Sequence, residues 1–577
     1  MSKRTRGLGL SLVMVMSSTL LTQGQASALP AGTPALGMVC TPGSVAGTTH
    51  TFNLVANTGH VQTPDGNSVF MWSYANADAP DNSRFQEPGP VLCVTQGETV
   101  VVNLTNTLAE PVSIVFPGQD AQVTASGVGV VAGLLTTEAA VAGSVSYSFT
   151  AGTPGTYIYQ SGSNVSLQVE MGLYGALIVR PTIGANFAYD ASTRFDPKRE
   201  FLQLLSSFDP DLHHAVEIGT PYDFNSLVNR YFAINGRDFP DSIQDNGSPL
   251  LPFQPYGALV RIQPNTPGNP YPALIRMVNV SPLNHPFHPH GNHLTEIAQD
   301  GRMLLSPSGA SASTEHFGEI VAAGQTQDYL LPWYDQDHWD PNGTAAQLLP
   351  AQTSYRNLSF KDGNTWYSGT PYLGYKGALP IGTVQQNVCG EWYFPFHSHA
   401  LNEFSNYDAG FGGMGTLLRV DPPGGCFAFP SATKILPPVG TANSGAYTNL
   451  GIDDAKYYKL NSTTIGTRSI DWYGQFSAVP AGATNLTVTY KGNNSVTANQ
   501  KIYIYNWAGA GSWIQIAGGA TGTPVGTADV SVTAASPASY IGTGANNGLV
   551  RIRVQTTGGA TNFVTGGNLM KLTYDAP

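Results

Sequence analysis

The sequence contains little charge, and it has no long apolar run after its N-terminal segment. Asp, Glu, Lys and Arg make up only 11% of the 577 residues, whereas glycine (65), proline (41) and aromatic residues (10%) are abundant. A membrane-spanning helix needs about 20 apolar residues in a row, so we expect no membrane span. Many turn-forming and aromatic residues with few charges are typical of secreted all-β modules, and they exclude a mainly helical or disordered chain.

Positive charge is scarce, and part of it lies at the very beginning of the chain. The formal net charge is −11, and Lys3, Arg4 and Arg6 precede an apolar run at 8–21 and the small residues 26–28. This order predicts a Sec-type secretory signal peptide at 1–28, without the adjacent arginine pair of a twin-arginine signal. We therefore expect a secreted or periplasmic protein. Its net charge after cleavage, −14 once those three cations are removed, argues against nucleic acid as a partner.

Cysteine is also scarce, with four residues in the whole chain. An even number in an exported chain predicts two disulfides, for which three pairings exist. We favour Cys40–Cys93 and Cys389–Cys426, because each pair lies within or beside one expected domain. No cysteine stands beside another potential ligand at the spacing of a metal site, so the sequence does not predict a cysteine metal centre.

Alternating polar and apolar residues predict strands along the whole chain, for example at 98–104, 144–150 and 550–554. A chain of this length is too long for a single core. We expect an all-β protein with two β-sandwich domains, at 46–182 and, with insertions, at 198–423. A composition rich in Thr, Ser, Gly and Asn predicts a third, jelly-roll-like β-sandwich at 440–577.

Histidine is missing from residues 440–577, and half of the histidines are concentrated in two short stretches. Six of the 12 histidines lie in 285–293, His-Pro-Phe-His-Pro-His-Gly-Asn-His, and in 397–399, His-Ser-His. Side chains two residues apart share one face of a strand. A lone histidine is more often a turn or core residue, but two such pairs on facing strands would form a four-imidazole cluster suited to copper or another divalent metal. The predicted ligands are His288, His290, His397 and His399.

These stretches resemble two motifs of the multicopper oxidases. Residues 285–291 are similar to the family motif His-Pro-x-His-x-His-Gly. Residues 396–414 are similar to its last motif, in which His-Cys-His is followed by a further histidine and an axial methionine. The resemblance covers about residues 50–423 and implies two cupredoxin-like Greek-key domains, copper as the cofactor and, as in related two-domain chains, a homotrimer. It also places His285 at a type 1 copper position and Met414 at the axial one.

The sequence departs from that family at several copper ligands. Val115 and Pro117 stand where one His-x-His pair of the first domain belongs. Gln160 and Gly162 stand where the other pair belongs. Ser398 replaces the type 1 cysteine, whose thiolate carries electron transfer. The resemblance therefore implies one mononuclear copper rather than a four-copper set. The expected second-shell groups, or ligands of a second weak site, are His285, His293, Glu403, Met414 and Gln160.

Different classes of function fit these observations. The first is a copper-dependent oxidoreductase with weak or no turnover, which would act on a small molecule or a metal ion. The alternative is a non-catalytic extracellular metal-binding or surface protein that attaches to polysaccharide through its C-terminal domain. A third is a metal-free structural protein whose histidines are relics. In the C-terminal domain, either a sugar-stacking face or part of the core is expected to include the following residues: Asp471, Trp472, Tyr473, Trp507 and Trp513.

Overall fold

The computed structural model describes residues 36–79, 85–119, 124–263, 265, 270–333, 360–362, 365–367, 392–407, 412–421, 426–437, 439–451, 455–519, 528–534 and 536–575. The predicted signal peptide and Cys389 lie outside these residues. None of the helices in the described part is both long and apolar enough to cross a lipid bilayer.

Strands make up nearly all of the regular structure. The N-terminal strands are β1 Ser44–Ala46, β2 Thr49–Gln62, β3 Ser68–Asn76, β4 Leu92–Thr95, β5 Thr99–Asn106, β6 Thr124–Ala132, β7 Thr137–Thr150, β8 Gly155–Gln160 and β9 Tyr174–Arg180. The central strands are β10 Glu200–Phe208, β11 Tyr231–Ile234, β12 Val260–Ile262, β13 Ala273–Asn279, β14 His285–Pro289, β15 Leu294–Gln299, β16 Arg302–Met303, β17 Thr314–His316, β18 Glu319–Val321, β19 Thr326–Leu331, β20 Phe360–Asp362, β21 Thr365–Tyr367, β22 Trp392–Ser398 and β23 Gly415–Val420.

The C-terminal strands and the short helices complete the described elements. The strands are β24 Cys426–Ala428, β25 Ala432–Ile435, β26 Thr441–Ser444, β27 Tyr458–Asn461, β28 Ser469–Phe476, β29 Thr484–Asn494, β30 Asn499–Asn506, β31 Ser512–Gly519, β32 Ala528–Thr533, β33 Val550–Thr557 and β34 Val564–Asp575. The α-helices are α1 Val165–Gln168, α2 Pro210–Glu217 and α3 Leu401–Phe404. Single 3-10 turns are η1 Ala191–Thr193, η2 Phe224–Ser226, η3 Asp241–Ile243, η6 Tyr447–Leu450, η7 Pro537–Tyr540 and η8 Gly544–Asn546.

The N-terminal sandwich packs a six-stranded sheet against a small one. The large sheet has the order β1-β2-β5-β7-β6, with β3 paired to β2, and the small sheet has the order β4-β9-β8. Burial follows the predicted period of two: Val100, Val102 and Leu104 of β5 are buried, whereas their neighbours are not. The predicted Cys40–Cys93 disulfide is confirmed and ties the start of the described chain to β4.

The second sandwich carries both histidine stretches in one sheet. Its sheets have the orders β11-β10-β13-β19-β15-β16, with β17 paired to β15, and β12-β23-β22-β14-β18. The core between them includes Ile275, Phe287 and Phe396. Strand β14 lies directly between β22 and β18. The two stretches, about 110 residues apart in the sequence, therefore become neighbours.

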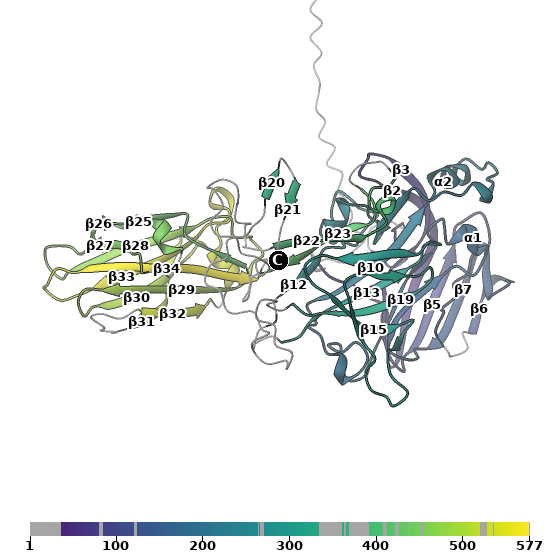
Figure 1. Ribbon diagram of the computed structural model, residues 1–577, viewed down its shortest axis with the longest axis horizontal. Helices are drawn as coiled ribbons and strands as arrows, with labels where there is room; N and C mark the ends of the chain where they lie inside the picture. Colours follow the sequence, from purple (N-terminus) through teal and green to yellow (C-terminus); the bar gives the residue numbers. More distant parts are fainter. Residues whose placement is uncertain are drawn as a thin grey trace, which may run out of the picture.

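The first two sandwiches share a buried seam, which joins them into one body (Figure 1). Its apolar part includes Ile158 and Ile178 of the first sandwich and Leu204 and Val278 of the second. The fully buried Arg276 crosses the seam: it pairs with Glu200 (Nε to Oε1, 2.8 Å) and donates to the Thr156 hydroxyl at 2.9 Å. A buried guanidinium is costly unless it is paired and hydrogen-bonded. These polar contacts therefore favour one arrangement of the two sandwiches across an otherwise apolar seam.

The C-terminal sandwich lies at the other end of the molecule (Figure 1). Its sheets have the orders β26-β27-β34-β29-β32, with β24 paired to β34, and β25-β28-β33-β30-β31. Strands β24 and β25 already pair inside these sheets, so this unit begins before the expected residue 440. Cys426 is buried and has no disulfide partner among the described residues; because Cys389 lies outside them, the Cys389–Cys426 disulfide stays a prediction.

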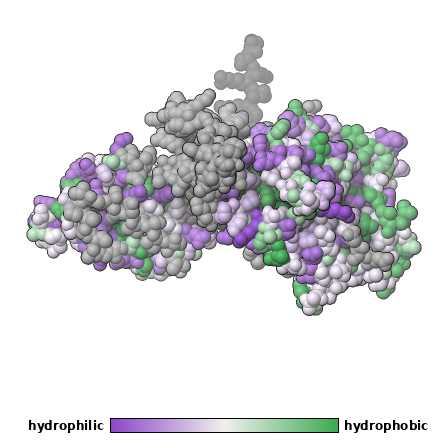
Figure 2. Space-filling model, turned by 60° about the horizontal axis from the view of Figure 1, so that its bottom comes forward, coloured by the Kyte–Doolittle hydropathy of each residue, from purple (hydrophilic) through white to green (hydrophobic). Residues whose placement is uncertain are grey.

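The hairpin β6–β7 exposes an apolar surface at the far end of the N-terminal sandwich. Large side chains that belong in a core are exposed there, among them Val128 (85%), Leu134 (95%) and Leu135 (60%). Figure 2 shows apolar residues gathered at this end of the molecule. Contiguous exposed apolar surface of this kind is typical of an interaction site.

Candidate metal centre

Strand pairing brings the predicted imidazoles together. Strands β14 and β22 are antiparallel, with His288 opposite His397 and Phe287 opposite Ser398. The two phenylalanines Phe287 and Phe396 point into the core, where their rings meet edge to face with centroids 4.6 Å apart. Because side chains alternate across a strand, the histidines beside them project from the opposite face.

The four predicted ligands form one cluster on that face. The His288 ring lies 4.8 Å from His290, 5.3 Å from His399 and 5.9 Å from His397, centroid to centroid. The Nε2 atoms of His290 and His397 are 3.1 Å apart. Two nitrogens that share one ion at about 2.0–2.1 Å are roughly 3 Å apart, so the spacing of this pair suits a common metal.

Backbone carbonyls orient two of these rings. The Nδ1–H of His288 donates to the carbonyl of Phe317, and that of His397 donates to the Ser398 carbonyl at 2.7 Å. A neutral imidazole whose Nδ1 carries the proton presents a lone pair at Nε2, which is the arrangement that metal-binding histidines adopt. Both rings are therefore prepared to bind through Nε2.

The environment favours the uncharged form of two imidazoles in the cluster. Burial, together with the neighbouring imidazoles, lowers the pKa of His397 to about 4, although its bond to the Ser398 carbonyl acts in the opposite direction. Burial and the nearby His288 and His399 also lower the pKa of His290. Metal ligands must be deprotonated, so these shifts favour binding of a cation at neutral pH.

The third and fourth rings are near the pair but do not yet converge with it. Within the described ranges, the one group of three or more residues whose ligand atoms all lie within 4.8 Å of one another is elsewhere, at Glu296, His316 and Glu319. His290 and His399 are exposed, so their rings have room to rotate. Rotation of these two exposed rings, with His288 held by the Phe317 carbonyl, would bring the four nitrogens together.

The predicted type 1 position holds a hydrogen-bonded network instead of an open ligand set. His285 is fully buried, and its Nδ1 is 2.9 Å from Glu403 Oε2. The hydroxyl of Ser398 donates to the same oxygen at 2.5 Å. Met414 is buried beside them, and its backbone N–H donates to the Glu403 carbonyl at 3.0 Å. Glu403 therefore engages Nδ1 of His285, while Nε2 of His285 is buried without a hydrogen-bond partner among the described residues. With Ser398 in place of a cysteine, these residues do not fit a thiolate copper site.

The first-domain positions that lack the expected histidines also lie together. Val115 and Gln160 form a two-way backbone bridge, with N···O distances of 2.8 and 3.2 Å. A Cβ added to Gly162 would lie 2.7 Å from the Val115 side chain. An apolar side chain thus fills the place of an imidazole. The contacts described for Gln160 lie within the N-terminal sandwich. His293 is exposed and stacks near the Phe317 ring at 6.5 Å, at the edge of the cluster.

Part of the chain matches a known protein family. Residues 83–183 match the family model described as multicopper oxidase. The chain is a relative of the multicopper oxidases. The probable nitrite reductase-hydroxylamine oxidoreductase fusion protein of Kuenenia stuttgartiensis is 28% identical over 242 residues, which are 41% of this chain and 24% of that protein. The match thus spans about a quarter of that relative's length.

Solved structures of multicopper oxidases align with most of this relative. The blue copper oxidase of Nitrosomonas europaea aligns with a TM-score of 0.41 and 17% identity over 64% of this chain and 86% of its own. A multi-copper oxidase from Pediococcus acidilactici aligns with a TM-score of 0.39 and 12% identity over 92% and 86% of the two chains.

The segment that matches the family model contains no histidine at all. This multicopper oxidase relative therefore keeps the first-domain scaffold without its imidazole ligands. Sequence reasoning did not find the acidic group around His316, because His316 is a lone histidine and its partners come from other strands. It also did not find the role of the Phe317 carbonyl, since main-chain atoms leave no signal in residue types.

Proposed function

We propose that the protein binds one copper ion through His288, His290, His397 and His399. The observation that carries this proposal is the 3.1 Å separation of the Nε2 atoms of His290 and His397. The lowered pKa values of both imidazoles and the carbonyl bond that directs Nε2 of His288 outward support it. A copper ion held there would supply one-electron redox chemistry. An all-nitrogen donor set also accepts zinc, so metal identity is part of the test.

Any reaction at this site would need direct contact with its electron donor. The position of the electron-relaying thiolate is taken by Ser398, which is fully buried and bonded to Glu403. The exposed His290 and His399 leave the cluster open to solvent, so a small molecule or a metal ion can approach it. We propose weak oxidoreductase activity at most, with extracellular metal binding as the alternative outcome.

Elemental analysis of the secreted, mature chain tests the proposal. After loading with Cu²⁺ and gel filtration, we expect about one copper per chain, and loss of most of it in the double variant His290→Ala/His397→Ala. His214→Ala is a matched control, because that histidine is exposed and lies on α2, away from the cluster. Equal copper content in the wild type and the double variant would refute the site.

Oxygen consumption then separates an enzyme from a binding protein. Copper-loaded protein with a phenolic donor or with Cu⁺ should consume oxygen slowly or not at all, because no thiolate relay exists. Uptake that disappears in the double variant would establish the oxidoreductase. Copper binding without uptake would establish the non-catalytic alternative.

We propose a second function, polysaccharide binding, for the outer face of the sheet β25-β28-β33-β30-β31. Trp472 points into the core, as the alternative interpretation expected, but the residues that alternate with the core form an aromatic face. Tyr505 lies 4.8 Å from Trp507 and 5.0 Å from Trp513, and the Arg551 guanidinium is 4.8 Å from the Trp507 ring. Partly exposed aromatic rings beside a cation are suited to stacking on sugars.

Retention on insoluble polysaccharides tests this second function. The full chain should be retained on at least one plant or bacterial polysaccharide. Trp507→Ala/Trp513→Ala should abolish retention, whereas Tyr447→Ala, at an exposed tyrosine outside the aromatic face, should not. Equal retention of all three proteins would contradict the assignment.

A further inference from the structure

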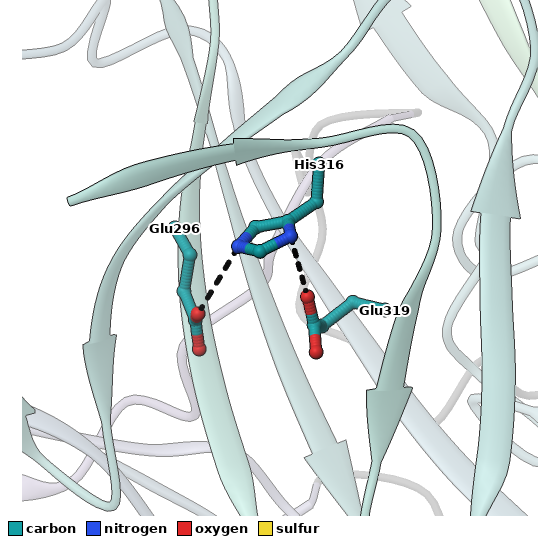
Figure 3. A group of neighbouring side chains, drawn as sticks. All are labelled: Glu296, His316 and Glu319. Carbon is teal, nitrogen blue, oxygen red and sulfur yellow. Dashed lines mark ion pairs between the residues drawn. The ribbon is translucent and has the colours of Figure 1, made fainter.

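A second group of metal-binding side chains lies on the strands next to the histidine cluster. Glu296 belongs to β15, His316 to β17 and Glu319 to β18. Figure 3 shows the His316 imidazole between the two carboxylates. Its Nδ1 is 3.0 Å from Glu319 Oε2, and its Nε2 is 3.8 Å from Glu296 Oε2. Ligand atoms of all three residues lie within 4.8 Å of one another.

The charges of this group are not balanced within the protein. The Glu296 side chain is only 5% exposed, and its other polar partner is the neutral amide of Gln299, at 2.7 Å. No Lys or Arg forms an ion pair with Glu296 or Glu319 among the residues that the structure describes. Burial raises the pKa of Glu296 against the lowering effect of its bond from Gln299, and the neighbouring Glu319 raises it further. Two carboxylates around one imidazole therefore leave room for an added positive charge.

We propose that Glu296, His316 and Glu319 bind a divalent cation. Two carboxylate oxygens and one imidazole nitrogen make a harder donor set than the four-imidazole cluster, and such sets suit Mn²⁺ and Zn²⁺. The ion would lie on the Nδ1 side of His316, where Glu319 is already close. The Glu296 carboxylate would reach it by rotation about its side-chain bonds. The added cation would neutralise the buried carboxylate, which the present ion pair does only when His316 is protonated.

The position of this site gives it a structural consequence for the histidine cluster. His316 and Glu319 flank the two-residue connection between β17 and β18, which belong to different sheets, and that connection contains Phe317, whose carbonyl orients His288. A cation that holds both ends of this connection would fix the carbonyl. This consequence rests on the proposed copper function, whereas cation binding at the carboxylates does not depend on it.

Titration with Mn²⁺ alone, followed by paramagnetic resonance of unbound Mn²⁺, tests the site in the full mature chain. Mn²⁺ is the probe because imidazole clusters bind it more weakly than other first-row metals. We expect one bound ion per chain. Glu296→Gln/Glu319→Gln should weaken binding at least tenfold. The matched control is Glu315→Gln, which removes an exposed carboxylate from the same strand as His316, β17.

Two further variants make the result independent of folding defects and of the histidine cluster. Glu319→Gln alone changes a partly exposed residue, so it should fold and still weaken binding. His290→Ala/His397→Ala should leave Mn²⁺ binding unchanged while it removes copper. The proposal is overturned if the wild type binds no Mn²⁺, which would leave the group as an ion pair only. It is also overturned if the glutamate variants and the control bind equally.

Discussion

At the scale of single residues, the chemistry of the histidine cluster depends on which ring nitrogens already form hydrogen bonds. Two histidines that resemble metal ligands in the sequence have different surroundings. His397 directs Nε2 toward a neighbouring imidazole, whereas His285 has its Nδ1 bonded to Glu403. The Nε2 atom of His397 thus faces a second potential ligand, whereas the Nε2 atom of His285 is buried without a hydrogen-bond partner in the described part of the chain. Sequence alone predicted both as ligands or near-ligands, because residue types do not reveal which nitrogen is in use.

Asp238 provides a residue-scale prediction of pH dependence. Burial raises its pKa to about 7, with Asp65 and Asp241 also contributing, against the effect of the Asn406 amide that donates to it at 2.6 Å. The folded state therefore holds a proton that the unfolded state releases above its ordinary value of 3.8. Folding stability should fall as pH rises from about 4 to about 7, and then level off.

Asp238→Asn should remove this pH dependence. An amide oxygen can still accept from Asn406 but carries no charge, so the variant should be more stable than the wild type at pH 8 by on the order of 2 kcal/mol. At pH 4 the two proteins should be nearly equal. Urea unfolding at both pH values measures the difference. A constant difference across that range would contradict the assignment to Asp238.

At the scale of elements, the centre depends on the pairing of β14 with β22. The residues of these strands alternate between core and outer face, so the apolar residues fix the register that brings His288 opposite His397. Period-two patterns predicted strands and the sharing of a face by each histidine pair. They did not predict which strands become neighbours, because pairing across about 110 residues depends on tertiary packing. For the same reason β24 and β25 were expected outside the C-terminal sandwich.

Phe287→Ala tests the role of the core in building the centre. Phe287 is buried between the sheets and contacts Phe396. Its truncation leaves a cavity and should lower the free energy of unfolding by about 3–5 kcal/mol. Copper affinity should fall as well, since the histidines lie on the same strands. The control is Ile320→Ala on the adjacent β18, where the side chain is 57% exposed and the cost should stay within about 0.5 kcal/mol.

At the scale of the whole molecule, the exposed hairpin β6–β7 predicts self-association. Val128, Leu134 and Leu135 lie on the N-terminal sandwich, at the opposite end from the C-terminal module (Figure 1). A homotrimer stays a prediction from family resemblance. Leu134→Lys/Leu135→Lys should reduce the sedimentation coefficient, whereas Ile465→Lys, at an exposed residue of the C-terminal sandwich, should not. A wild type that sediments as a monomer would contradict this prediction.

The overall architecture was largely predictable, because three β-rich regions of different composition become three sandwiches. The buried seam was not predictable, since Arg276, Glu200 and Thr156 come from separate strands and look like ordinary polar residues in the sequence. The acidic group around His316 was not predictable for the same reason, because its residues also come from separate strands. The whole molecule therefore combines a recognisable oxidase scaffold with sites that only the three-dimensional arrangement reveals.

The most direct test of the central claim is paramagnetic resonance of the copper-loaded mature protein, with the copper content measured on the same sample. The four-imidazole centre predicts about one Cu²⁺ per chain, hyperfine splitting from several nitrogens, and no intense absorption band at about 600 nm, because a thiolate ligand is missing. Three or more coppers per chain, an intense blue band, or a copper signal that survives His290→Ala/His397→Ala would contradict the account.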